Sequence, residues 1–145
     1  MKSYALAFCL SFPGLVAGGV ARAQNGQALP VDEEITINGT QVACTGIGDE
    51  AISDPRWPAY SVRTEFADGK AEYLSEMDIS IATAKGVTIL KARCDGPWFL
   101  AKLRPGKYKV SATFDGRLTK TARFTAPAGG QSRTIVRFPE LGADQ

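Results

Sequence analysis

Histidine is absent from this chain of 145 residues. Its absence excludes Ser-His-Asp and Cys-His catalysis, histidine proton shuttles and metal sites built on imidazole. The phosphate-binding loops GxGxxG and GxxxxGK[ST] are missing as well. Carboxylates cluster at Asp32-Glu33-Glu34, Asp49-Glu50 and Glu76-x-Asp78, but near turns and polar faces such residues mostly solvate the surface. We therefore expect a protein that is not an enzyme and has no cofactor and no metal, with a carboxylate-based hydrolase as a distant alternative.

Long apolar stretches are also lacking, apart from one at the N-terminus. Lys2 precedes an apolar run over residues 4–20, and Ala21-Arg22-Ala23 then supplies the small-x-small pattern that signal peptidase recognises. The run is shorter than the roughly 20 apolar residues of a transmembrane helix and is interrupted by a Pro-Gly pair. We expect residues 1–23 to be a signal peptide cleaved after Ala23, which makes the mature protein periplasmic or secreted, with no membrane span.

Cysteine is scarce, with three residues in the whole chain, and Cys9 would leave with the signal peptide. Cys44 and Cys94 then remain. In an oxidising compartment, two cysteines in a small exported domain predict a disulfide. The alternative is a pair of buried free thiols, while a redox-active pair is disfavoured because no Cys-x-x-Cys spacing is present.

The mature chain lacks net charge, because removal of residues 1–23 leaves 15 basic and 15 acidic side chains. The charges are nevertheless separated along the chain. Residues 24–78 hold 3 basic and 11 acidic side chains, and residues 79–139 hold 12 basic and 2 acidic ones. Two interpretations are open: charges that merely solvate the sheet edges and attract each other, or a basic binding face. The first interpretation is simpler, because strands from both halves of the chain can alternate in the sheets and bring the acidic and basic residues back together.

From Tyr60 onward, short runs alternate between apolar and polar residues and are separated by Gly, Pro and Asp. Period-two alternation places one set of side chains against a core and the other in water. Seven such runs, without helical periodicity of useful length, predict an all-β fold, an antiparallel β-sandwich. The runs cover residues 60–66, 77–82, 87–94, 98–103, 107–114, 118–125 and 132–138.

Two turns predict the register of hairpins. Asn38-Gly39 suits a two-residue turn that pairs Ile35 with Val42 and adds an N-terminal hairpin. By alternation along this hairpin and along the 87–94 run, the side chains of Cys44 and Cys94 both point toward the core, where the two sulfurs can bond. For the hairpin near Asp115, we predict a three-residue connection over residues 114–116 that pairs Ala112 with Leu118, because only this length puts both apolar sets on one side. The sets are Tyr108, Val110 and Ala112 on one strand, and Leu118, Ala122 and Phe124 on the other.

The remaining segments set the domain boundaries. Residues 45–59 fit no strand pattern, and we expect a loop with one helical turn near residues 49–53. We expect a flexible lead-in over residues 24–32, a single β-sandwich domain over residues 33–139 and a tail over residues 140–145.

Two tryptophans are the candidate binding residues. Trp98 and Phe99 are neighbours in a strand, so their side chains point to opposite faces of the sheet. Their strand is therefore expected to be central and covered on both sides. We favour core packing for Trp98, near the disulfide, over an exposed stacking platform. Trp57, between Arg56 and Tyr60 in the long loop, is the better binding candidate by location, although loop tryptophans often plug the end of a sandwich. The outward lysines of the 107–114 strand are explained as protection of a sheet edge.

The segments "DGPW" at 95–98, "LRPGKYKV" at 103–110 and "GGQ" at 129–131 together resemble the carboxypeptidase regulatory-like group of transthyretin-like β-sandwiches. The resemblance covers residues 60–138 and includes small exported bacterial proteins. It implies a non-catalytic accessory or binding fold, with no active-site residues to carry over.

The expected function is therefore that of a non-enzymatic binding or structural module in the cell envelope. The alternative is a binder of carbohydrate or peptidoglycan fragments that stacks sugars on Trp57 or Trp98. The partner is expected to be an envelope protein or glycan and not a nucleic acid, and the sequence leaves the oligomeric state open.

Overall fold

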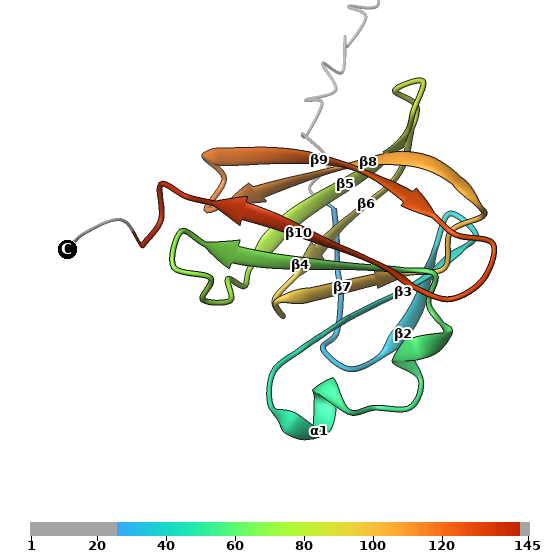
Figure 1. Cartoon of the computed structure of the whole chain (residues 1–145), viewed down its shortest axis with the longest axis horizontal. Helices are drawn as coiled ribbons and strands as arrows, with labels where there is room; N and C mark the ends of the chain where they lie inside the picture. Colours follow the sequence, from blue (N-terminus) through green and yellow to red (C-terminus); the bar gives the residue numbers. More distant parts are fainter. Residues whose placement is uncertain (1–25, 143–145) are drawn as a thin grey trace, which may run out of the picture.

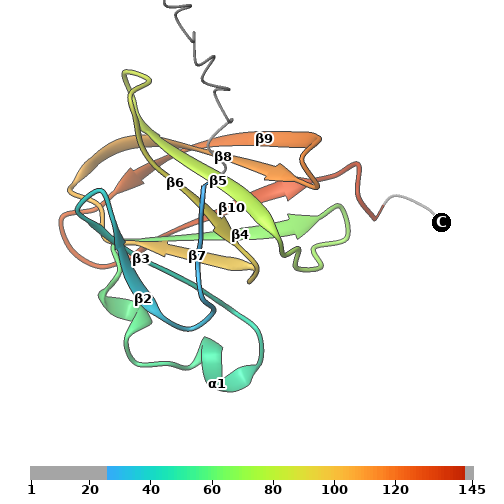
Figure 2. The ribbon, with the colours of Figure 1, turned by 180° about the vertical axis from the view of Figure 1, so that it is seen from behind.

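Two β-sheets packed face to face make up residues 26–142, the part of the chain that this computed structural model describes (Figure 1). The expected signal peptide, residues 1–23, lies outside the described residues. Sheet A has the strand order β1-β6-β5-β8-β9, and sheet B has the order β10-β4-β7-β3-β2. Figure 2 shows the same two layers from behind. The strands are β1 (Gln27–Ala28), β2 (Glu34–Ile37), β3 (Thr40–Thr45), β4 (Val62–Asp68), β5 (Met77–Thr83), β6 (Thr88–Cys94), β7 (Trp98–Ala101), β8 (Gly106–Phe114), β9 (Leu118–Ala126) and β10 (Ser132–Phe138).

The predicted β-sandwich is confirmed, but its sheets are mixed, and the prediction of an antiparallel sandwich was wrong. β10 pairs with β4 in parallel from Ser132 opposite Val62 onward, and β1 pairs with β6 in parallel. The loop after β9 carries the chain from sheet A to the edge of sheet B and delivers Ser132 beside Val62, so both strands run in one direction. Alternation of apolar and polar residues has the same period in parallel and antiparallel strands, so the sequence pattern contained no sign of this.

The N-terminal hairpin has the predicted register. Ile35 pairs with Val42, and the two turn residues Asn38 and Gly39 have positive φ angles of 50° and 82°. Asn and Gly are the residues that adopt such angles at least cost. The inward side of this hairpin is buried in the core, as the alternation predicted.

The connection between β8 and β9 has the predicted length of three residues but not the predicted register. Ala112 pairs with Lys120 instead of Leu118, and Phe114, which we placed in the loop, stays in the strand and packs against the core. Asp115 and the glycine after it have φ angles of 52° and 65°. Because Asp tolerates the left-handed region, the turn begins one residue later than we predicted. The apolar sets of the two strands do share one face, as predicted.

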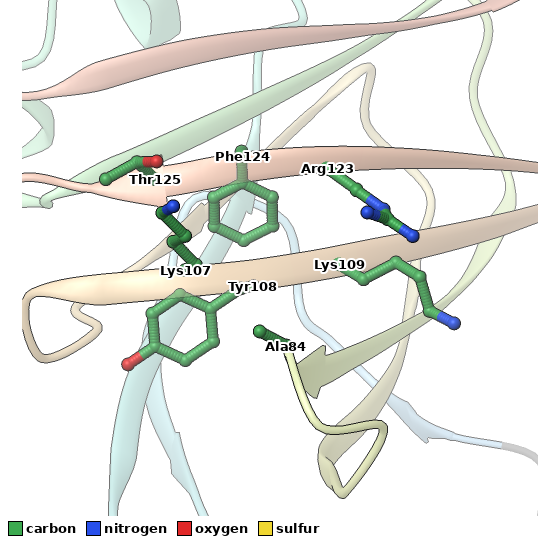
Figure 3. A pocket seen from close by; sticks show the side chains of 7 residues that line it. All are labelled: Ala84, Lys107, Tyr108, Lys109, Arg123, Phe124 and Thr125. Carbon is green, nitrogen blue, oxygen red and sulfur yellow. The ribbon is translucent and has the colours of Figure 1, made fainter.

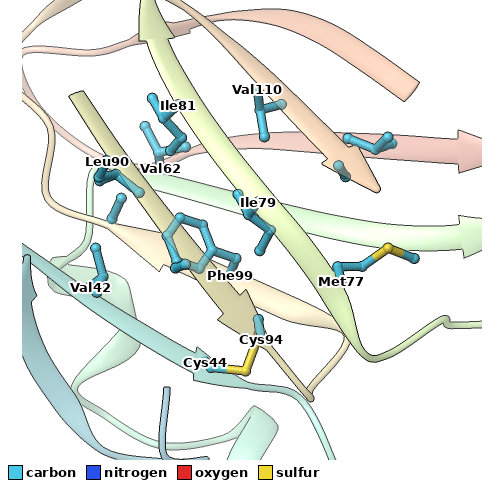
Figure 4. Packing of buried hydrophobic residues seen from close by; sticks show 14 of the residues in the cluster. Val42, Cys44, Val62, Met77, Ile79, Ile81, Leu90, Cys94, Phe99 and Val110 are labelled. Carbon is cyan, nitrogen blue, oxygen red and sulfur yellow. A yellow bond between two sulfur atoms is a disulfide. The ribbon is translucent and has the colours of Figure 1, made fainter. Parts of the chain in front are cut away.

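Side chains from the inner faces of both sheets form the core, and a disulfide joins the sheets across it (Figure 4). The predicted Cys44–Cys94 bond is present, with the two Cα atoms 5.5 Å apart. It links β3 of sheet B to β6 of sheet A. Both cysteines are fully buried, as expected from the alternation on their strands.

The segment expected to be a flexible lead-in is held by both sheets from Gly26 onward. Gln27 pairs with Ala92 of β6, and the Asp32 N–H donates to the Cys44 carbonyl of β3. This segment therefore spans the two sheets beside the disulfide. A Cβ at Gly26 would lie 2.4 Å from the Ala92 nitrogen, so only glycine allows this close approach.

A loop covers the outer face of sheet B, on the side away from sheet A (Figure 1). It contains the predicted helical turn, α1 (Asp49–Ile52), and a 3-10 turn, η1 (Trp57–Ala59). β7 lies in the middle of sheet B and is buried on both faces, as predicted: Phe99 enters the core, and Leu100 packs beneath the loop. No helix within residues 26–142 is long and apolar enough to cross a membrane.

Loss of the disulfide should lower the free energy of unfolding. The bond closes a loop across a sequence separation of 50 residues, for which the chain-entropy model gives about 4 kcal/mol. We expect a Cys44→Ala/Cys94→Ala variant to unfold at a lower urea concentration than the oxidised wild type. The reduced wild type is the control and should match the variant; a variant as stable as the oxidised protein would contradict the prediction.

Candidate ligand-binding face

Arg56, Trp57 and Tyr60 lie together, as their spacing suggested, but Trp57 is not an exposed platform. Its side chain is buried, with 3% of the residue exposed, and its Nε1–H donates to the Ala51 carbonyl at 2.7 Å. The Arg56 guanidinium lies 4.5 Å from the ring centre and pairs with Asp54 at 2.7 Å. Trp57 therefore plugs the loop against sheet B.

Tyr60 is fully buried beside Trp57, with the ring centres 5.9 Å apart in an edge-on arrangement. Its hydroxyl has no hydrogen-bond partner among residues 26–142. Burial, followed by the negative charge of Glu34, raises the pKa of this phenol. Tyr60 therefore stays neutral and acts as part of the packing beneath the loop.

Trp98 lies apart from this group, on the outer face of β7. It is buried, with 5% of the residue exposed, and the Arg63 guanidinium covers it at 4.3 Å from the ring centre. Gly46 lies against the ring, where a Cβ would approach the indole to 2.9 Å. Trp98 is thus buried, but the core packing that we favoured was wrong, because the ring lies on the outer face of β7 and outside the core cluster between the sheets. Neither tryptophan offers a free face to a sugar.

A buried ion cluster on the same outer face was not predicted. Glu65 of β4 is fully buried, and both its oxygens are occupied. Arg133 of β10 donates to them with Nε and Nη2, Arg63 donates with Nε at 3.1 Å and the Tyr73 hydroxyl donates at 2.9 Å. The cluster depends on the parallel pairing of β10 with β4, which the sequence pattern did not reveal.

Opposing effects set the ionisation of Glu65. Burial by itself raises its pKa, but hydrogen bonds from Arg133 and Tyr73 and the charges of both arginines outweigh burial and hold the pKa below its usual value. Glu65 is therefore a charged anchor that ties β10 and the β4–β5 loop to β4. No group of three or more Cys, Asp or Glu side chains within residues 26–142 is arranged to hold a metal ion.

The outer face of sheet A is basic, and no loop within residues 26–142 covers it in the way that the α1 loop covers part of sheet B (Figure 1). We define the basic face as the outward side of β5, β6, β8 and β9. Five outward side chains on these strands are basic, and one, Asp78, is acidic. The basic ones are Lys91, Arg93, Lys107, Lys109 and Arg123. Much of the acidic charge of the chain lies on the other side, in the β1–β2 link and the α1 loop. The charge separation seen in the sequence therefore survives folding in part, since Arg133 and Arg137 of the basic half lie on the outer face of sheet B.

Part of the basic face is hollowed between β8 and β9 (Figure 3). The hollow measures about 250 Å³. Lys109 lies directly opposite Arg123 across the strands, and Lys107 lies opposite Thr125. The other lining residues are Ala84, Tyr108 and Phe124.

The three cations of this hollow have no acidic partner. Lys107, Lys109 and Arg123 make no ion pair among residues 26–142. Like charges directly opposite each other destabilise a sheet, so this arrangement costs stability. Our explanation of the lysines as edge protection was wrong, because β8 lies between β5 and β9 and is not an edge strand.

Burial of both tryptophans predicts that iodide does not quench the native protein. The chain has two tryptophans, both inaccessible. We expect a Stern–Volmer slope near zero in the native state and strong quenching after unfolding in urea. An Arg63→Ala variant uncovers Trp98 and should restore part of the quenching. Native quenching as strong as that of the unfolded chain would contradict the burial.

The Glu65 cluster predicts a dependence of stability on pH. A lowered pKa stabilises the fold above the pKa of an unfolded glutamate, about 4.3, and this contribution is lost as the pH falls through the folded pKa. Glu65→Gln should lose on the order of 2 kcal/mol of unfolding free energy at neutral pH. The gap to wild type should close in acid, as measured by urea unfolding between pH 7 and 3. Glu72→Gln, at an exposed position, is the control; an equal gap at all pH values would contradict the role of the charge.

Comparison of the chain with protein-family models found no match, and comparison with curated proteins found none either. Function is therefore inferred below from the charge, burial and shape of the described residues. The surface that these features single out is the basic face with its hollow.

Proposed function

We propose that the protein is a non-enzymatic β-sandwich module, exported to the periplasm or beyond, that binds an anionic ligand of the cell envelope across the basic face. The observation that carries this proposal is the hollow that Lys107, Lys109 and Arg123 line without an acidic partner among residues 26–142. Unpaired cations on one uncovered surface attract anions and leave their donors free for carboxylate or phosphate oxygens.

Export is supported by two features. The N-terminal sequence has the pattern of a signal peptide, and Cys44–Cys94 is a disulfide, which persists in oxidising compartments. We also propose that the chain is related to the carboxypeptidase regulatory-like modules that its sequence resembles, which are β-sandwiches as well. These modules are similar in being accessory or binding folds, which agrees with a binding role.

The ligand class that fits best is an anionic glycan. Next to the cations, the basic face carries rows of hydroxyls, with Ser111 opposite Thr121 and Thr113 opposite Thr119. A second hollow of about 310 Å³ on this face is lined by two of these residues, Ser111 and Thr113, together with Ser80, Lys91 and Asp78. The cations can pair with acid groups of a ligand, and the hydroxyls can form hydrogen bonds with sugar hydroxyls. The face therefore suits a charged polysaccharide. Stacking on tryptophan, our earlier alternative for sugar binding, has no exposed ring to support it.

Binding to polygalacturonate, a carboxylated glycan, tests the proposal. We expect binding that weakens as salt rises, no binding to neutral dextran, and an affinity at least about tenfold lower in Lys107→Glu/Lys109→Glu, a loss of about 1.4 kcal/mol. The measurement is isothermal titration calorimetry, with melting temperature as the check on folding.

The matched control is Lys70→Glu/Arg137→Glu. It makes the same change in net charge away from the basic face, at exposed positions in the β4–β5 loop and on β10. Its affinity should stay near that of the wild type. Equal losses in both variants, or no binding of polygalacturonate to the wild type, would overturn the proposed function.

A further inference from the structure

A further hollow lies at the end of the sandwich where three connections meet. It measures about 500 Å³ and lies between η1 and its flanks, the β7–β8 connection and the β9–β10 loop. Each of the three connections contributes one proline, namely Pro58, Pro105 and Pro127. Proline has a fixed φ and loses little entropy when a ligand binds, so these walls are rigid. We call this site the loop-end hollow.

Hydrogen bonds between the three connections hold the loop-end hollow in shape. The Gln131 amide donates to the carbonyls of Trp57 and Tyr60 at 2.8 and 3.0 Å. The Ser61 hydroxyl accepts from the Leu103 N–H at 2.9 Å and donates to the Leu103 carbonyl. The hollow is therefore formed before any ligand arrives, which lowers the cost of binding.

Two exposed cations line the loop-end hollow, Lys102 and Arg104. Neither makes an ion pair with a carboxylate among residues 26–142. The Lys102 ammonium lies 4.9 Å from the centre of the Tyr60 ring. A cation over an aromatic ring keeps its charge available to an anion on its other side. This hollow thus has the same ligand chemistry as the one on the basic face.

The two hollows are neighbours. Lys107 and Thr125 line the hollow of the basic face, while Pro105 and Pro127 line the loop-end hollow. Between these residues lies one cross-strand pair, Gly106 opposite Ala126. Both are small, and the Tyr108 ring lies beside Gly106. Tyr108 also lines the hollow of the basic face, and its hydroxyl donates to the Arg104 carbonyl at 2.8 Å, so this ring forms the boundary between the two hollows. Residues 105–109 span on the order of 14 Å in an extended strand.

We infer that the loop-end hollow is a second subsite for the ligand of the basic face, so that the ligand is an extended acidic polysaccharide that occupies both hollows at once. This inference rests on the proposed function. Two linked subsites bind a long ligand more tightly than a short one, because the second contact forms within the complex. A nucleic acid fits less well, because the tryptophans that would stack its bases are buried.

The test compares ligands of two lengths. Digalacturonate is too short to reach both hollows, whereas decagalacturonate is long enough. For the wild type, we expect the association constant per sugar unit to be at least about tenfold higher for the decamer than for the dimer. Lys102→Glu/Arg104→Glu should remove this advantage and lower the affinity for the dimer far less than Lys107→Glu/Lys109→Glu does. Lys107→Glu/Lys109→Glu should weaken both ligands, and Lys70→Glu/Arg137→Glu should weaken neither.

The outcomes separate the two proposals. If the decamer has no advantage, or if Lys102→Glu/Arg104→Glu affects it no more than the control pair does, the second subsite is disproved while binding of the dimer still supports the proposed function. If neither galacturonate binds, the proposed function itself fails. If a single-stranded oligonucleotide of equal charge binds as tightly as the decamer, the assignment to a polysaccharide is overturned.

Discussion

Burial of one face of each sheet against the other is the constraint on which the rest of this structure depends. The inner faces supply the core residues at every second position, and the disulfide between Cys44 and Cys94 joins the sheets through that core. Phe99 of the central strand β7 and Ile79 of β5 meet between the layers (Figure 4). Because these faces are used for folding, any ligand must be bound by an outer face or by the loops at an end of the sandwich.

The side chains on the two outer faces differ in whether they have partners within the protein. On sheet B, Trp57 and Tyr60 pack over Leu100, Arg63 covers Trp98, and Glu65 is enclosed by its arginines. These large groups are thus engaged within the protein, whereas Arg137 on the same face is exposed. On sheet A, the cations between β8 and β9 face each other without an acid, although that arrangement costs stability. A cost of this kind, on a face that no loop within residues 26–142 covers, supports the binding proposed for this face.

The aromatic residues show how composition misleads about binding. Tryptophan is a common platform for sugars, and Trp57 stood in a long loop that suggested exposure, whereas for Trp98 we favoured core packing. Each is instead covered by an arginine, Arg56 over Trp57 and Arg63 over Trp98. A cation over an indole ring stabilises the packed state and closes the ring to ligands. The basic residues therefore have two roles in this protein, as covers on sheet B and as unpaired donors on sheet A.

The cysteine count predicted the disulfide. Local patterns predicted every strand except β1, together with the faces of their side chains, because period-two alternation and turn residues act over a few neighbouring positions. Asn38-Gly39 set its hairpin register for this reason, while the turn at Asp115 misled us because Asp also tolerates a positive φ. Only the tertiary structure decided that β10 runs parallel to β4, that Glu65 meets Arg133 and that Lys109 lies opposite Arg123. These contacts depend on the order and register of strands, which packing of the whole chain fixes and no local pattern encodes.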